Sequence, residues 1–335
     1  MITIDVSVHT DISVIIPCAK APEVFRECLE ALSTSKYQPR EIILVDDAMD
    51  ETSRHIASEF PVNVVKNPST GVASARNHGA NIAEGSVLLF IDTDVIITSD
   101  ALKYVHEALK DKELGGIVGV QSVFIRYRNF FSVYKNHWMR YTYKRLKKNI
   151  HLFYTSFAAI RKEHFTVSGG FDENYRLPSV EDTAFGAVLG ERNIRIDPLF
   201  MAEFEHAKAY SLKSILKTDF NRSIALVRYV LRTWRSHQTI SKTSVPKRFM
   251  VSSALMGLIG LSLLAVPLFP VVSSAFIGIN LLVILMVNGS WIHYLAKNES
   301  VCFSVKAAIF LPLDILFVVA GMFTGFLTYC SGKRY

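Results

Sequence analysis

Two aspartates, Asp92 and Asp94, stand one residue apart directly after an apolar run at residues 87–91. The run predicts a buried strand, so both carboxylates would lie at the edge of a sheet. Paired carboxylates there suit a divalent cation, and oxygen ligands favour Mg²⁺ or Mn²⁺. Without a cation, the pair would carry a large desolvation cost. Because a cation at this edge can neutralise a diphosphate, we expect a nucleotide-linked substrate.

Apolar strands alternate with helical patterns over the first hundred residues. We expect strands at residues 12–16, 41–45, 62–65 and 86–91, and helices at residues 22–32, 51–60 and 71–83. This alternation predicts an α/β fold with a doubly wound, mostly parallel sheet. Functional groups of such sheets collect at the carboxyl ends of the strands. Pro17, Asp46 with Asp47, and Asp92 with Asp94 all fall at these ends.

The C-terminal part of the chain is apolar and carries few charges. Its runs at residues 249–266, 271–291 and 307–330 are each near the ~20 residues that cross a bilayer. They predict a region of two to three transmembrane helices at residues 246–335, and the third run would either span or re-enter. The chain starts without the basic and apolar pattern of a signal peptide, and basic residues precede the first run. We therefore expect an integral membrane protein with a cytosolic catalytic domain, in the inner membrane if the cell is bacterial.

A basic segment with regularly spaced aromatic residues lies between these regions. Residues 114–162 contain ten Lys or Arg and no Asp or Glu. The spacing predicts a helix over about residues 124–148, suited to a membrane interface with anionic lipid. The alternative is an aromatic stripe packed in a core. Basic aromatic stretches also bind nucleic acid, but the apolar tail argues against that partner. A second amphipathic pattern predicts interfacial helices at residues 208–245, after a catalytic domain at residues 1–207.

Six short motifs occur in the order typical of glycosyltransferase family 2, which the chain resembles over about residues 12–206. The motifs are Val14-Ile15-Ile16-Pro17, Leu44-Val45-Asp46-Asp47, Gly71-Val72-Ala73-Ser74-Ala75-Arg76-Asn77, Phe90-Ile91-Asp92-Thr93-Asp94, Gly169-Gly170-Phe171-Asp172-Glu173 and Glu181-Asp182. The resemblance implies a GT-A fold and a nucleoside diphosphate sugar as donor. The apolar tail is similar to that of members that act on lipid-linked acceptors.

The resemblance also implies catalytic and metal-binding roles. It assigns the catalytic base to Asp182, beside Glu181; with a phosphate acceptor, which is already ionised, Asp182 would mainly orient it. The alternative for this pair is to complement a helix dipole. Asp94 would bind the metal directly, while Asp92 would contact the sugar or ribose or reach the metal through water. His206 is a further candidate metal ligand, since some relatives use a downstream histidine, although a lone histidine is often structural.

The donor side of the site combines carboxylates with an arginine. Asp46 or, better, Asp47 would accept hydrogen bonds from the nucleobase or ribose, or would instead cap the helix that follows. Arg76 would bind the diphosphate through two parallel hydrogen bonds, or would form a surface salt bridge. The full set of expected donor-binding residues is Pro17, Asp46, Asp47, Arg76, Asp92 and Thr93.

The chain also departs from the family pattern. Cys18-Ala19-Lys20 stands where the family often has an aromatic residue and an asparagine. The Gln-x-x-Arg-Trp motif of processive members is absent, which favours transfer of a single sugar. We expect an inverting, metal-dependent enzyme that moves one sugar to a polyprenyl phosphate or glycolipid at the cytosolic membrane face. A soluble or protein acceptor, or a non-catalytic sugar-nucleotide-binding subunit, would be the alternatives.

Overall fold

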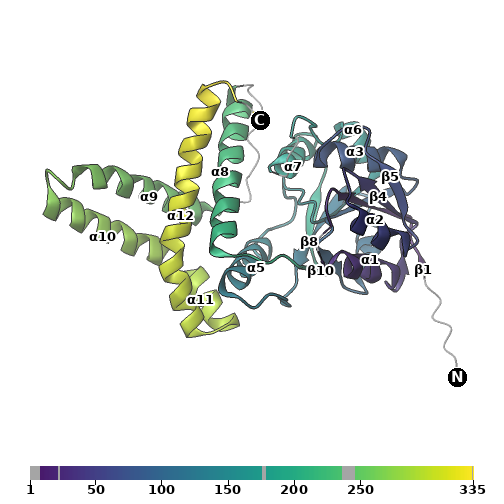
Figure 1. The fold of residues 1–335 in the computed structure, drawn as a ribbon, viewed down its shortest axis with the longest axis horizontal. Coiled ribbons are helices and arrows are strands. Elements are labelled where there is room, and N and C mark those ends of the chain that lie inside the picture. The colour runs from purple at the N-terminus through teal and green to yellow at the C-terminus, as the bar shows by residue number, and fades with distance from the viewer. Residues whose placement is uncertain (1–7, 22, 176–178, 236–245, 334) are drawn as a thin grey trace. The chain divides into compact units, whose positions relative to one another are not determined.

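The computed structural model describes residues 8–21, 23–175, 179–235, 246–333 and 335 (Figure 1). The chain forms two compact units. Among the described residues, the first unit contains the sheet and takes in those up to residue 127 and those within residues 143–209, and the second contains helices and takes in those within residues 128–142, 210–235 and 246–335. Residues 128–142, which the sequence analysis places within the catalytic domain at residues 1–207, thus belong to the second unit.

One mixed sheet of eight strands organises the first unit, in the order β5-β4-β2-β6-β9-β8-β10-β7. Neighbours β5, β4, β2 and β6 are parallel, as the alternating pattern predicts, and β9 runs antiparallel between β6 and β8. The mostly parallel α/β sheet is thus confirmed. The strands are β2 (Ile12–Cys18), β4 (Glu41–Asp46), β5 (Asn63–Lys66), β6 (Val87–Ile91), β7 (Val95–Ile97), β8 (Gly116–Gln121), β9 (Phe157–Arg161) and β10 (Ile196–His206), with a small separate pair β1 (Val8–His9) and β3 (Tyr37–Gln38).

Helices cover both faces of this sheet because alternate strand residues point to opposite sides. Val14 and Ile16 of β2 belong to a buried cluster with Leu29 of α1, while Ile15 faces α3. A Cβ at Gly79 would lie 2.6 Å from the Ile15 side chain, so glycine allows α3 to approach the sheet closely. The helices of this unit are α1 (Phe25–Ser33), α2 (Glu51–Ser58), α3 (Val72–Ile82), α4 (Ala101–Ala108), α6 (Lys162–Ser168) and α7 (Glu181–Glu191).

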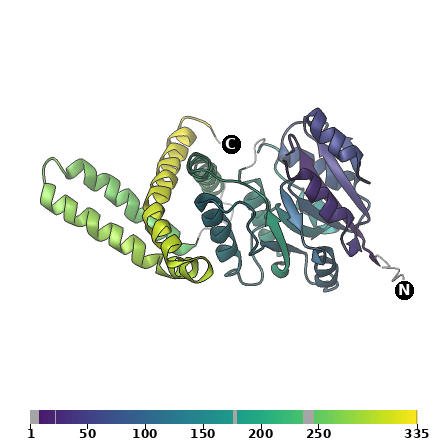
Figure 2. The same ribbon diagram turned by 60° about the horizontal axis from the view of Figure 1, so that its bottom comes forward.

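In the residues that the structure describes, the second unit consists mainly of helices, and three of these are long and apolar enough to cross a membrane. These are α9 (Lys247–Ala265), α10 (Pro270–Val287) and α12 (Val301–Cys330). Helices α9 and α10 lie side by side in both views (Figures 1 and 2). The remaining helices are α5 (Phe130–Tyr143), α8 (Leu212–Arg235) and α11 (Gly289–Asn298). Residues 236–245, the end of the expected interfacial segment, lie outside the described residues.

The aromatic stripe of the basic segment packs within the helical unit. Tyr134 and Tyr141 of α5 are buried and contact Trp291 of α11, with ring centroids 5.7 and 5.2 Å apart. This is the packed-core arrangement that the sequence left as an alternative, while contact with anionic lipid stays a prediction. The helix spans Phe130–Tyr143 rather than about residues 124–148. Arg126, which precedes it, forms ion pairs with Glu27 and Glu205 instead.

Two glycines one turn apart allow α8 and α12 to pack closely. Gly321 and Gly325 of α12 face the backbone of Phe220 and Ile224 in α8, and a Cβ at Gly325 would lie 3.0 Å from the Ile224 Cα. Small residues at this spacing are typical of helix pairs in membranes, where close backbone packing supplies the attraction between helices. The amphipathic α8 therefore has a tightly packed partner in the apolar α12.

Candidate functional site

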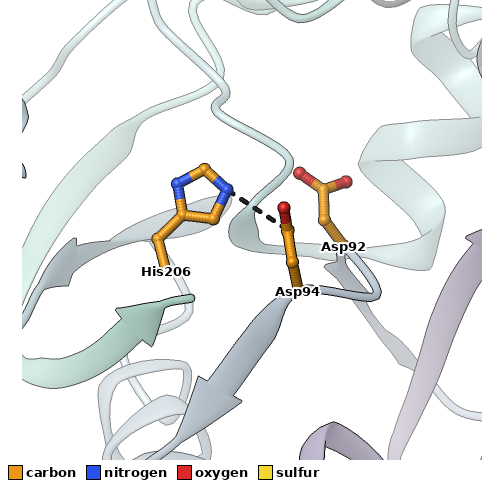
Figure 3. Close-up of side chains that lie close together, drawn as sticks. All are labelled: Asp92, Asp94 and His206. Carbon is orange, nitrogen blue, oxygen red and sulfur yellow. Dashed lines mark ion pairs between the residues drawn. The ribbon is translucent and has the colours of Figure 1, made fainter. Parts of the chain in front are cut away.

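Sheet topology brings the two aspartates and the histidine together. Asp92 and Asp94 lie in the turn between β6 and β7, and β7 pairs antiparallel with β10 so that Val95 is opposite His206. The Nε2 atom of His206 lies 3.2 Å from Oδ1 of Asp94 (Figure 3). One potential ligand atom from each of Asp92, Asp94 and His206 lies within 4.8 Å of the others. Two carboxylates and an imidazole form a donor set that suits Mn²⁺ or a similar divalent cation.

Neighbouring groups tune the Asp94–His206 pair. Burial raises the pKa of the Asp94 carboxyl, but its contact and hydrogen bond with His206 and the charge of Lys208 outweigh this effect and hold its pKa below the ordinary value. Asp94 is therefore ionised at neutral pH, as a metal ligand must be. The other ring nitrogen of His206, Nδ1, lies 3.2 Å from the side-chain amide of Gln121. Such an outer contact orients an imidazole toward a metal.

Arg76 joins the aspartate pair to the acidic pair at the start of α7. Its Nη2 atom donates to Oδ1 of Asp92 at 3.0 Å, and its Nη1 atom donates to Oε1 of Glu181 at 3.0 Å. Burial alone lowers the pKa of this guanidinium, but the charges of Asp92 and Glu181 outweigh burial and raise it above its ordinary value. The surface salt bridge considered from the sequence is wrong, because the Arg76 side chain is only 3% exposed.

The acidic pair is buried at the first turn of α7. Glu181 and Asp182 begin the helix, and both are buried. The Oδ1 atom of Asp182 accepts a hydrogen bond from the backbone N–H of Thr183 at 2.6 Å. Two buried carboxylates at a helix N-terminus benefit from the helix dipole, which supports the structural alternative for this pair but does not conflict with a catalytic role. The roles of Glu181 and Asp182 remain predictions.

The expected donor-binding carboxylates, Asp46 and Asp47, have partners within the protein. Asp46 accepts from Arg54 at 2.8 Å, whereas Asp47 accepts from the backbone N–H of Gly71, the residue that precedes α3. Neither caps α2, because the side chain of Asp50 accepts the Ser53 N–H at its start. The alternative of a helix cap at Asp46 or Asp47 was thus wrong by a few residues.

The other two expected donor-binding residues, Pro17 and Thr93, are half-buried at the same edge of the sheet. Pro17 lies in β2 and Thr93 lies between the two aspartates of the turn, so the parallel strands β2, β4 and β6 bring all of the expected donor residues except Arg76 to one edge. Arg76 lies on α3 and reaches this edge through its contact with Asp92. Contact of these residues with a donor remains a prediction.

Two polar residues of the site escaped the sequence analysis. Ser156 donates its hydroxyl to Oδ2 of Asp92 at 2.9 Å, and Gln121 contacts His206. Gln121 is the last residue of β8, and Ser156 immediately precedes β9. A polar residue at the end of an apolar strand could have marked Gln121 and Ser156 as candidates. The sequence does not reveal, however, that β8 pairs with β10 and β9 pairs with β6.

Comparisons with known proteins agree with this architecture. Residues 13–167 match the model of Glycosyl transferase family 2. Glycosyltransferase GlyA of Streptococcus pneumoniae serotype 4 is 23% identical over 197 residues, which is 55% of this chain and 27% of that protein. Glycosyltransferase GlyG of the same organism is 29% identical over 114 residues, 32% of this chain and 38% of that protein. The matches thus cover well under half of these relatives.

A solved structure shares the fold over nearly the whole chain. It is the mannosyltransferase PcManGT from Pyrobaculum calidifontis in complex with GDP-Man and Mn²⁺. The TM-score is 0.57 at 16% identity, over 98% of this chain and 89% of that one. The likeness establishes a GT-A fold for the sheet-containing unit, followed by C-terminal helices.

Proposed function

We propose that the chain is a metal-dependent, inverting glycosyltransferase, which the match of residues 13–167 to the model of Glycosyl transferase family 2 supports. It would transfer one sugar from a nucleoside diphosphate sugar to a lipid-linked acceptor, a polyprenyl phosphate or a glycolipid. The observation that carries this proposal is the cluster of Asp92, Asp94 and His206, which Arg76 connects to the acidic pair of α7. A single displacement needs one group of residues that binds the donor and a second that acts on the acceptor, and the cluster and the acidic pair would supply these two groups.

The donor side of the site fits a divalent cation. Ligand atoms on opposite sides of Mg²⁺ or Mn²⁺ lie about 4 Å apart, so a cluster within 4.8 Å needs little rearrangement to hold the ion. When bound, Mg²⁺ or Mn²⁺ would offset the charge that develops on the departing nucleoside diphosphate. Asp94 and His206 would hold the ion, with Asp92 directly or through water, while Asp47 would contact the nucleobase or ribose.

The acceptor side of the site would depend on Asp182. Its carboxylate would take the proton from an acceptor hydroxyl as the acceptor oxygen attacks the anomeric carbon. A phosphate acceptor is already ionised, and Asp182 would then orient it. Attack on the face opposite the leaving diphosphate inverts the anomeric configuration.

A lipid-linked acceptor is favoured by the helical unit. Three of its helices are long and apolar enough to cross a membrane, which would keep the chain at the bilayer. Cationic side chains recur along the amphipathic α8, and basic groups on such a helix suit anionic headgroups. The catalytic domain would face the cytosol, where nucleotide sugars are made.

A transfer screen on the purified full chain tests the proposal. Protein with Mn²⁺ or Mg²⁺ is incubated with UDP-, GDP- and dTDP-sugars, with or without polyprenyl phosphate or a membrane lipid extract, and nucleoside diphosphate release is measured. We expect release that needs both metal and lipid. Asp182→Asn should lower kcat by about 10²–10⁴-fold on a hydroxyl acceptor, and much less on a phosphate acceptor, with donor binding retained.

The other outcomes separate the alternatives. Release that a soluble acceptor stimulates and lipid does not would make the apolar helices a plain anchor. Binding of a nucleotide sugar without turnover of any acceptor would favour a non-catalytic subunit. Full turnover after removal of divalent metal by a chelator would overturn the metal assignment.

A further inference from the structure

We propose that Arg76 is a positioning residue, which fixes Asp92 of the metal cluster and Glu181 of the acidic pair at a constant separation. The inference rests on the proposed function, because the proposed function is what defines a donor side and an acceptor side of the site. It differs from the role expected from the sequence, in which Arg76 binds the donor diphosphate. The contacts, the burial and the surroundings of the guanidinium each support the new role.

The contacts use both ends of the guanidinium fork. Arg76 lies on α3, and its two terminal nitrogens each donate to a different carboxylate at 3.0 Å, one on Asp92 and one on Glu181. Asp92 follows β6 and Glu181 begins α7, so a single side chain of α3 connects the turn after the next strand with a helix that begins 105 residues after Arg76. A lysine ammonium is a point charge on a flexible stem and cannot reproduce this planar, two-sided geometry.

Burial argues against direct contact between Arg76 and a diphosphate. The side chain is 3% exposed, and its Nε atom is enclosed with no hydrogen-bond partner among the described residues. The guanidinium also lies 5.7 Å from the centre of the Phe171 ring. A donor phosphate would therefore have to open the packing around Arg76 to reach its remaining N–H groups. If it displaced Asp92 or Glu181 instead, it would leave that carboxylate without its partner, which is costly for a buried group.

Each carboxylate is fixed at its second oxygen as well. The hydroxyl of Ser156 donates to Oδ2 of Asp92 at 2.9 Å, and the backbone N–H of Ser179 donates to Oε2 of Glu181 at 2.7 Å. With both oxygens held, neither side chain can rotate freely. Arg76 therefore transmits the position of the metal cluster to the first turn of α7, which also carries Asp182.

A double-mutant cycle tests this connection. Arg76→Lys keeps the charge, Glu181→Gln keeps the shape of its partner, and both are measured alone and together. If Arg76 acts through Glu181, each single variant should lower kcat/KM. The kcat/KM of the double variant should then be about tenfold or more higher than the value expected from multiplying the two single losses. Arg26→Lys is a matched control, because Arg26 donates through both terminal nitrogens to the carboxylate of Glu59 on the surface. This substitution should leave activity unchanged.

A second readout does not need turnover. Amide hydrogen exchange of residues 179–184 should accelerate in Arg76→Lys and in Glu181→Gln, and should stay unchanged in Arg26→Lys. The affinity of Arg76→Lys for nucleoside diphosphate with Mn²⁺, measured by calorimetry, should stay within about threefold of wild type.

The two proposals can fail separately. Additive effects in the cycle, or a loss of diphosphate affinity larger than about tenfold without faster exchange at residues 179–184, would make Arg76 a donor ligand and overturn the positioning role. If the wild type neither binds nor turns over any nucleotide sugar, the proposed function fails. Hydrogen exchange still decides whether Arg76 positions α7, because it requires no substrate.

Discussion

Replacing Asp94 with asparagine removes one negative charge from the candidate metal cluster while keeping the shape of the side chain. An ion bound among atoms within 4.8 Å of one another lies no farther than that from Asp94. Removing a unit charge at this distance from a divalent ion costs about 2 kcal/mol in water and about 7 kcal/mol at an effective dielectric constant of about 20. The Asp94 and His206 side chains are 21% and 17% exposed, so we take the lower figure as a minimum.

This minimum corresponds to a loss of metal affinity of about twentyfold or more. Electron paramagnetic resonance of free Mn²⁺ measures the affinity directly, on purified Asp94→Asn and wild-type protein, without any sugar donor. Asp100→Asn, which removes the same charge from an ion pair with Lys36 elsewhere in the first unit, should leave Mn²⁺ binding unchanged. If Asp94→Asn binds Mn²⁺ within threefold of wild type, this cluster does not hold the metal.

Two further predictions concern packing and pH. A Cβ at Gly186 of α7 would lie 2.8 Å from the backbone of residues 151–153, so Gly186→Ala should lower the free energy of unfolding by about 1–3 kcal/mol and reduce kcat, as urea unfolding and the transfer assay would show. Gly257→Ala, which meets nothing within 4 Å, is the control, and equal stability of the two variants would contradict this packing. Burial lowers the pKa of His137 more than the contact with Glu299 raises it, so the pKa of this histidine is lower in the folded protein than in the unfolded chain. As the pH falls through about 6.5, the unfolded chain therefore takes up a proton at this residue before the folded protein does. Stability should therefore decrease below that pH by up to about 1.4 kcal/mol per unit, and His137→Gln should flatten this slope in thermal unfolding between pH 5 and 7.5; an unchanged slope would contradict the assignment.

The sequence alone was sufficient for the features that depend on local patterns. Alternating apolar runs predicted strands β2, β4, β5 and β6 within one or two residues. Of these, β2, β4 and β6 are mostly buried, and buried parallel strands are short apolar segments between helices. Composition predicted the three apolar helices in the same way. Asp92 and Asp94 could be singled out as candidate metal ligands because two carboxylates directly after a buried strand would be costly to desolvate without a cation, and their role stays a prediction.

The partners of Arg76 were decided only by the tertiary structure. From the chain, an arginine near the start of a helix looked free to bind a diphosphate, whereas packing encloses it between Asp92 and Glu181. The carboxylates lie 16 and 105 residues away, and no local pattern encodes contacts over such separations.

The same limit applies to the strand pairing and the aromatic stripe. His206 reaches Asp94 only because β7 and β10 pair antiparallel, and β9 was not foreseen between β6 and β8. The stripe of α5 could equally have faced lipid or a core, because helical spacing identifies an apolar face without naming what covers it. Periodicity depends on neighbours in the chain, while a site depends on which distant elements pack together, and only the folded structure determines that.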